Sequence, residues 1–271
     1  MNKILVPVDF SKTSANALYY AIQLFATSSS EITVLHSYDT RSSAALLMKN
    51  IDGVLEKDAQ HKMDELIQEV QQKYPDANLN PKIIKRPTIS AISALGDSGD
   101  FDFIVMGTKG ASGLKEVFMG SVAGGVISRT SAPVIVVPAN YSFRSLEEIV
   151  FAIGNDPFSS VTVTPLKNIA KKHRSKIKVL HIADKRTTDL DVPLGHIADL
   201  NPSIDYAFGT GDTNKDLNDY LMKDYAGLLC MVRVKKGFME RLLDESVTLK
   251  QTFNSPVPLL ILHEQDKLKN T

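Results

Sequence analysis

The sequence predicts an α/β protein built from two tandem open parallel-sheet sandwiches, each with about five strands and helices on both faces. Three observations lead to this prediction. The length of 271 residues suits two domains better than one compact domain. Four segments recur in the same order in the two halves of the chain. Each half also alternates short apolar runs with helical patterns, and strands joined by helices form parallel sheets.

The internal repeat is clearest in ITVLHSYD at residues 32–39, which returns as IKVLHIAD at residues 177–184. The same offset aligns KILVPVDFS with EIVFAIGND. At a smaller offset DFIVMG matches LLCMVR, and APVIVVPAN is echoed by SPVPLLILHE. A polar stretch near residues 140–145 separates the repeats. We therefore expect one domain at residues 1–140 and a second at residues 145–265.

The first repeat contains the elements of one such domain. Short β-branched and apolar runs predict strands at residues 3–8, 32–36, 81–85, 103–106 and 133–137. Helices are expected after Ser11 and over residues 42–74, 89–95 and 120–128. In the first helix, Ala17, Ala21, Leu24 and Phe25 share one face. The second repeat is similar but about 20 residues shorter, mostly through loss of the long helix.

Composition excludes several classes of function. The 31 basic and 31 acidic residues balance, so there is no overall positive field to hold nucleic acid. The single cysteine, Cys230, excludes an internal disulfide and a multi-cysteine metal site, and its apolar surroundings predict a buried, inert thiol. No apolar stretch approaches the roughly 18–20 residues of a membrane helix, and no signal peptide is apparent. We expect a cytoplasmic protein without a membrane or nucleic-acid partner.

The segment MGTKGASGLKEVFMGSV, residues 106–122, carries the most chemical information. It follows a predicted strand and leads into a predicted helix. Gly107 and Gly110 would let the backbone turn and approach a ligand without a clash at Cβ. Gly120 and Ser121 stand where unpaired helix amides and a hydroxyl would attract phosphate oxygens. Neither a Walker A loop nor a GxGxxG fingerprint fits this spacing.

This loop has a glycine, two residues, a glycine, nine residues and then Gly-Ser, and it resembles the nucleotide loop of the ATP-binding universal stress proteins. KILVPVDFS, VLHSYD and SAPVIVVP resemble strands of that family in the same order. The resemblance covers nearly all of residues 1–140. It implies an adenine nucleotide alpha hydrolase-like fold. As function, it implies a stress-response protein that binds ATP or a related adenine nucleotide in its first domain.

The resemblance also implies site residues. Asp9 would contact the adenosine, Pro7 and Val8 would wall the base, and the backbone at Ser37 would contact adenine. Ribose and phosphates would be held by Gly107, Gly110, Gly120, Ser121 and Val122. A divalent ion, Mg²⁺ or Mn²⁺, would be carried chiefly by phosphates and water, since the sequence contains no metal-ligand cluster.

Alternative interpretations stay open at this point. Asp9 is also a plausible helix-capping residue. The glycines also suit a ligand-free scaffold or partner-binding module. Ser11 is expected to cap a helix, while His36 and His181 are expected to be core histidines. Slow ATP hydrolysis is the most that we expect of enzymatic activity, because no general base, arginine finger or Walker B-like aspartate accompanies the loop.

The second repeat departs from the nucleotide-binding pattern. Gly154 stands at the position of Asp9, Val232 at that of Gly107 and Glu245 at that of Gly120. Lys235 replaces Gly110, and only Ser246 agrees, opposite Ser121. A glutamate at the helix start would repel phosphate and occupy the same dipole. We therefore expect the second repeat to have a structural or interaction role.

In the family that the chain resembles, two such domains pair through their last strands. Residues 134–137 and 259–262 are therefore expected to pair and to cover each other's edge, which would make the chain a pseudo-dimer. Further association into a homodimer is left open by the sequence.

Overall fold

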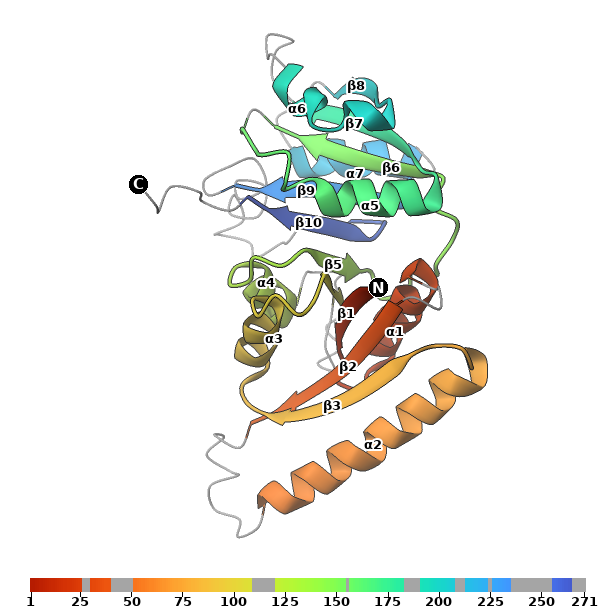
Figure 1. Cartoon of the computed structure of the whole chain (residues 1–271), viewed down its shortest axis with the longest axis vertical. Coiled ribbons are helices and arrows are strands. Elements are labelled where there is room, and N and C mark those ends of the chain that lie inside the picture. The colour runs from red at the N-terminus through yellow and green to blue at the C-terminus, as the bar shows by residue number, and fades with distance from the viewer. Residues whose placement is uncertain are drawn as a thin grey trace. The chain divides into compact units, whose positions relative to one another are not determined.

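A computed structural model describes residues 1–25, 30–39, 51–108, 120–154, 156–182, 191–207, 213–223, 226–234 and 255–264 (Figure 1). The chain divides into two compact units, Met1–Ala132 and Pro133–Thr271. The predicted α/β class is confirmed, with parallel sheets, alternating helices and a duplicated arrangement of strands. The boundary between the units precedes the last strand of the first repeat, which therefore lies in the second unit.

Among its described residues, the first unit contains four parallel strands in the order β3-β2-β1-β4. These are β1 (Asn2–Pro7), β2 (Ser30–Tyr38), β3 (Leu79–Lys85) and β4 (Phe103–Gly107). Their helices are α1 (Lys12–Phe25), α2 (Ile51–Lys73), α3 (Thr88–Gly96) and α4 (Ser121–Ile127). The chain moves one way from β1 to β3 and returns past β1 to reach β4. Right-handed crossovers therefore place α1 and α2 on one face and α3 on the other.

Local sequence explains how α1 begins and how it packs. Its amino end is capped by Ser11, whose Oγ accepts a hydrogen bond from the Ser14 amide at 3.2 Å, as the sequence predicts. The predicted apolar face is buried, and the ring of Phe25 lies 5.0 Å from the ring of Phe103 at the start of β4. Helix α1 thus packs against both β1 and β4.

The second unit contains six strands among its described residues, in the order β5-β10-β9-β6-β7-β8. They are β5 (Val134–Val137), β6 (Glu148–Ile153), β7 (Lys176–Ile182), β8 (Ser203–Ala207), β9 (Leu228–Arg233) and β10 (Leu259–His263). Helices α5 (Thr164–His173), α6 (Asp191–Gly195) and α7 (Thr213–Lys223) connect them, with a 3₁₀ turn, η2, at Ala198–Leu200. Strand β10 is parallel to β9 and antiparallel to β5, so the predicted pairing of residues 134–137 with 259–262 is confirmed.

The register of the strands repeats the offsets found in the sequence. Ile4 of β1 lies opposite Ile32 of β2, and Ile149 of β6 lies opposite Ile177 of β7. In the same way, Ile4 lies opposite Phe103 of β4, and Ile149 lies opposite Leu228 of β9. The 5 residues of α6 replace the 23 residues of α2, which accounts for most of the predicted shortening.

Two buried residues of the second unit fulfil their sequence predictions. Cys230 is fully buried, and this burial raises the pKa of its thiol. His181 is also buried, which lowers the pKa of its imidazole, and its ring lies 6.0 Å from that of Tyr206. None of the helices in the described ranges has the length and apolar character needed to cross a membrane.

Candidate functional site

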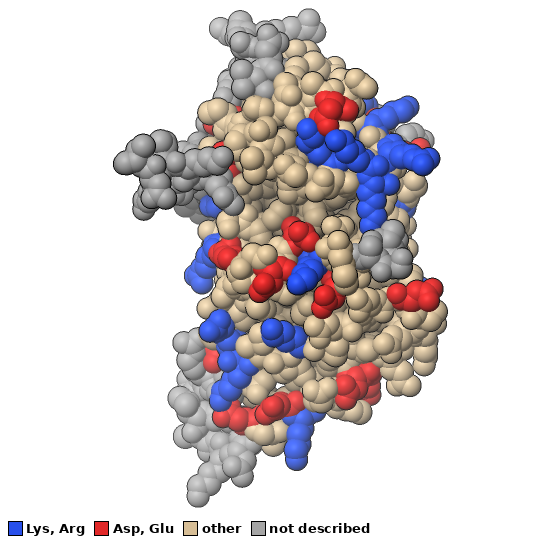
Figure 2. Space-filling model, in the orientation of Figure 1, with Lys and Arg blue, Asp and Glu red and all other residues tan. Residues whose placement is uncertain are grey.

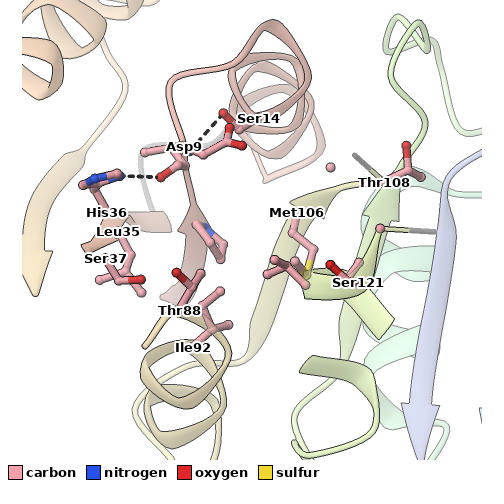
Figure 3. Close-up of a pocket in the computed structure, with 16 residues that line it drawn as sticks. Asp9, Ser14, Leu35, His36, Ser37, Thr88, Ile92, Met106, Thr108 and Ser121 are labelled. Atoms are coloured by element: carbon pink, nitrogen blue, oxygen red, sulfur yellow. Dashed lines mark hydrogen bonds between the residues drawn. The ribbon is translucent and has the colours of Figure 1, made fainter. Parts of the chain in front are cut away.

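A pocket of about 210 Å³ opens in the first unit beyond the carboxyl ends of β1, β2 and β4 (Figure 3). Strand order reverses between β1 and β4, because β2 and β3 extend the sheet on one side of β1 and β4 lies on the other. The crevice at such a reversal is where open α/β sheets bind ligands. Topology alone therefore marks this pocket as the candidate site.

The pocket has an apolar middle and polar ends. Val8, Ile92 and Met106 supply apolar surface from the end of β1, from α3 and from β4. Figure 3 shows His36 and Ser37 on one side of the pocket and Thr108 and Ser121 on the other. This distribution suits an elongated ligand with a flat apolar part and a polar group at each end.

Asp9 lies on the pocket wall, but part of its carboxylate is already engaged within the protein. Its Oδ1 accepts hydrogen bonds from the Ser11 amide at 3.1 Å and the Ser11 hydroxyl at 2.6 Å. Its amide donates to Ser14 Oγ at 3.2 Å. Asp9 thus organises the turn before α1, as the capping interpretation expects, and the same exposed side chain borders the pocket.

His36 is half-buried on the pocket wall, so the prediction of a core histidine is wrong for this residue. Its Nδ1 lies 2.9 Å from the carbonyl oxygen of Val8, which can only accept a hydrogen bond, so Nδ1 carries the proton. Its ring lies 4.4 Å from the ring of Phe10, whose backbone is left-handed with φ of 61°. Together these contacts hold the loop that follows β1 against β2.

Gly107 lines the pocket, and it also lies where α1 packs closely against β4. A Cβ at this position would lie 2.7 Å from Thr13 Cγ2 and 3.0 Å from the Thr13 carbonyl oxygen. Its φ is not positive, so the turn off β4 does not itself require glycine. The close approach is that of α1 to β4, a reason for glycine here that the sequence did not suggest.

The segment that begins α4 forms the other side of the pocket. Gly120, Ser121 and Val122 all line it. The Gly120 amide donates to the Thr108 carbonyl at 2.5 Å, so this amide is not available to a ligand, contrary to the sequence expectation. Among the described residues, the amides of Ser121 and Val122 have no acceptor, as is usual for the first turn of a helix.

The structure gathers most of the predicted residues in this one pocket. Pro7, Val8, Asp9, Ser37, Gly107, Gly120, Ser121 and Val122 line it, whereas Gly110 lies outside the described residues. Sequence reasoning missed eight further lining residues: Ser14, Leu35, His36, Thr88, Ile92, Met106, Thr108 and Ala123. Four of these, His36, Met106, Thr108 and Ala123, are adjacent to a predicted residue along the chain. Thr88 and Ile92 come from α3, and no motif in the sequence points to them.

A carboxylate also contacts the segment before the first helix of the second unit. Ser159 and Thr162, three residues apart like Ser11 and Ser14, precede α5. Glu264, directly after β10, accepts hydrogen bonds from the Ser159 amide at 2.9 Å, from the Ser159 hydroxyl and from the Thr162 hydroxyl. The counterpart of Asp9 is Gly154, so the carboxylate that contacts this segment follows β10 and not β6. Lys235, Glu245 and Ser246 lie outside the described residues.

The placing of charged residues in the described part of the chain bears on metal and nucleic-acid binding. No group of three or more His, Cys, Asp or Glu side chains within the described ranges could hold a metal ion. On the face drawn in Figure 2, acidic and basic side chains alternate over the first unit, and basic ones gather over α5. Lys171 in the last turn of α5 pairs with Asp199 at 2.7 Å, and basic residues at a helix carboxyl end stabilise its dipole.

Comparison with known proteins identifies the family. The profile of the universal stress protein family matches residues 1–138, half of the chain. The chain belongs to the universal stress protein family. A universal stress protein of Methanocaldococcus jannaschii is 29% identical over 156 residues, which is 50% of this chain and 93% of that protein. Universal stress protein YxiE of Bacillus subtilis is 28% identical over 150 residues, 50% of this chain and 98% of its own.

Solved structures extend the likeness to both repeats of this universal stress protein. A universal stress protein from Archaeoglobus fulgidus matches 97% of this chain and 99% of its own, with 23% identity and a TM-score of 0.70. At that identity the likeness establishes the tandem fold and not a shared ligand. A universal stress protein solved in complex with cAMP matches 50% of this chain, with 21% identity and a TM-score of 0.39. The bound cAMP is a property of that protein.

Proposed function

We propose that the first unit of this universal stress protein binds ATP or a related adenine nucleotide in the pocket beyond β1, β2 and β4. The observation that carries the proposal is the convergence of eight residues of the family's loop and strand motifs on one pocket at the reversal of strand order. Val8, Ile92 and Met106 would enclose the base and ribose. Ser121, at the start of α4, would meet the phosphates, and a Mg²⁺ or Mn²⁺ ion would be carried by those phosphates and water.

Titration calorimetry of ATP into the full chain tests this proposal, with a thermal shift as a second readout. At a ligand concentration 100 times Kd, binding stabilises the folded protein by about 2.7 kcal/mol. Gly120→Leu should abolish both signals. The backbone of Gly120, with φ −59° and ψ 155°, accepts an L-residue without strain, so the added side chain would act by filling the pocket.

Gly124→Ala is the matched control in the same helix. A Cβ at Gly124 meets nothing within 4 Å, and the residue does not line the pocket. The control should bind ATP like the wild type. Absence of heat and of thermal stabilisation for the wild-type chain at millimolar ATP would refute nucleotide binding and favour the scaffold interpretation.

For the second unit we propose a structural or interaction role without nucleotide. Gly154 offers no carboxylate in place of Asp9, and Val232 in β9 carries a side chain where β4 has Gly107. The calorimetric stoichiometry should therefore be one nucleotide per chain, and two would contradict this assignment. The pairing of β5 with β10, the last strands of the two repeats, supports the pseudo-dimer expected from the family.

A further inference from the structure

The edge strand β8 of the second unit leaves two large apolar side chains exposed. Ile204 is 42% exposed and Tyr206 is 38% exposed. They stand two residues apart in a strand, so they lie on the same face of the sheet. Asp205 between them points to the other face, because its Oδ2 accepts a hydrogen bond from the Tyr220 hydroxyl of α7 at 2.9 Å. Ile204 and Tyr206 therefore lie on the face opposite α7, which is the face that carries α5 (Figure 1).

The first unit covers the corresponding face with its longest helix. The sequence repeat aligns β7 with β2, and the strand registers then place Tyr206 of β8 at the position of Ile83 of β3. Helix α2 packs against β2 and β3 and buries an apolar stripe with the spacing of one helix face, formed by Ala59, Met63, Leu66 and Val70. In the second unit, the described part of the same connection contains only α6, with 5 residues, and η2, with 3.

This shorter connection packs beside α5. The Lys167 and Lys171 ammonium groups of α5 lie 2.6 and 2.7 Å from the carboxylate oxygens of Asp199 in η2. Asp199 precedes Ile204 by five residues, so the apolar pair lies next to this cluster along the chain. The surface formed by Ile204, Tyr206, Lys167 and Lys171 is called the β8 face below.

The α5 side of the β8 face is basic. Lys167 and Lys171 share the single carboxylate of Asp199, which leaves this cluster with a net positive charge. The side chain of Lys171 is 57% exposed, and α5 contains no acidic residue. Carboxylates of an incoming partner would therefore be attracted to this side.

The first unit shows which kind of helix covers such a face. Tyr19 of α1 stands five residues after Ser14, as Lys167 of α5 stands five residues after Thr162. The Tyr19 hydroxyl donates to Glu69 of α2 at 2.6 Å, so in both units this position contacts the connection that leads to the edge strand. Six acidic residues and three lysines make α2 a net acidic helix. Its counterpart on the second unit should share that character.

We propose that the β8 face binds an amphipathic helix of a partner protein, with an apolar stripe and an excess of acidic residues. The helix would take the place on the second unit that α2 takes on the first. Its apolar side chains would contact Ile204 and Tyr206, and its carboxylates would lie toward Lys167 and Lys171. This inference rests on the interaction role proposed for the second unit, and it adds a surface and a kind of partner. It does not require that the first unit bind a nucleotide.

A display library of helices, with the full chain as bait and no nucleotide present, tests the proposal. Each member has 23 residues, keeps apolar residues at the spacing of the α2 stripe, and carries glutamate or lysine at each exposed position. Members rich in glutamate should be enriched. Fluorescence anisotropy of labelled, enriched peptides then measures their affinity for the chain.

Three variants locate the binding surface. Ile204→Ser and Tyr206→Ser should each weaken an enriched peptide about 10-fold or more, because each removes an apolar anchor. Lys171→Gln should weaken it about 2- to 5-fold, as expected for an exposed ion pair. Melting temperatures should stay close to that of the wild type, because all three side chains are exposed.

Met222→Ser is the matched control. Met222 is 74% exposed on α7, on the opposite face of the sheet, and its replacement should leave the affinity for the peptide unchanged. Sedimentation velocity of the wild type and of Ile204→Ser shows whether the β8 face instead joins two copies of this chain. ATP should bind Ile204→Ser as it binds the wild type.

Several results would overturn the proposal. They are a library with no enriched member, enrichment of lysine-rich helices, or enriched peptides that bind Ile204→Ser and Tyr206→Ser as tightly as the wild type. A wild-type dimer that Ile204→Ser converts to a monomer would also overturn it, because the occupant would then be a second copy. Failure of ATP binding with intact peptide binding would refute the nucleotide proposal alone, and the reverse result would refute this inference alone.

Discussion

Replacing Gly107 with alanine tests why this position lacks a side chain. The new Cβ would lie 2.7 Å from Thr13 Cγ2, 3.0 Å from the Thr13 carbonyl oxygen and 3.3 Å from its carbonyl carbon. Two of these three atoms are backbone atoms in the first turn of α1, so the helix or β4 must shift. Overpacking of this kind costs about 1–3 kcal/mol. We expect Gly107→Ala to lower the free energy of unfolding by that amount, or the melting temperature by about 3–5 °C per kcal/mol.

Urea unfolding followed by circular dichroism measures the effect, because the chain contains no tryptophan. Combining Gly107→Ala with Thr13→Ser removes the Cγ2 atom of the closest contact and should restore part of the lost stability. If Gly107→Ala unfolds at the same urea concentration as the wild type, the packing explanation is wrong. The lack of a side chain would then have to be explained by the ligand.

Three further predictions concern regions outside the pocket. Glu264→Ala removes the acceptor of the Ser159 amide and hydroxyl, so urea unfolding should show a loss of about 1.5–3 kcal/mol; unchanged stability would show that this contact is not needed. Burial and the hydrogen bond to Glu69 raise the pKa of Tyr19 from 10.0 to about 12. The resulting stability is present below pH 10 and lost between pH 10 and 12, and absorbance titration at high pH should show a late-titrating component that is smaller in Tyr19→Phe. Cys230 should react with a thiol reagent only after unfolding, and rapid reaction of the folded chain would contradict its burial.

The family motifs predicted the location of the site because they lie at strand ends. Pro7 ends β1 and is followed by Val8 and Asp9, Ser37 lies near the end of β2, and Gly107 ends β4. In a parallel sheet these ends meet at one edge, so the local pattern along the chain was enough to bring the residues together. Thr88 and Ile92 were not predictable, because they reach the pocket only through the way α3 packs against the sheet.

Residue roles were less predictable than residue positions. The spacing of the loop suggested that Gly107 makes room for a ligand, but the atoms nearest to a Cβ there belong to Thr13 on α1. The apolar setting of His36 suggested a core position, yet the ring faces the pocket wall and bonds to the Val8 carbonyl. Both differences have one cause. Which atoms surround a side chain depends on elements distant in the sequence.

The sequence by itself determined the duplicated α/β architecture, the correspondence between the strands of the two repeats and the family. Periodicity and repeat offsets are local properties that the backbone geometry translates directly into helices and paired strands. Only the tertiary structure decided that β5 lies in the second unit, that Glu264 contacts the segment before α5, and that Thr88 and Ile92 of α3 line the pocket. Each of these depends on contacts between distant segments, and no local pattern fixes the neighbours of a buried atom.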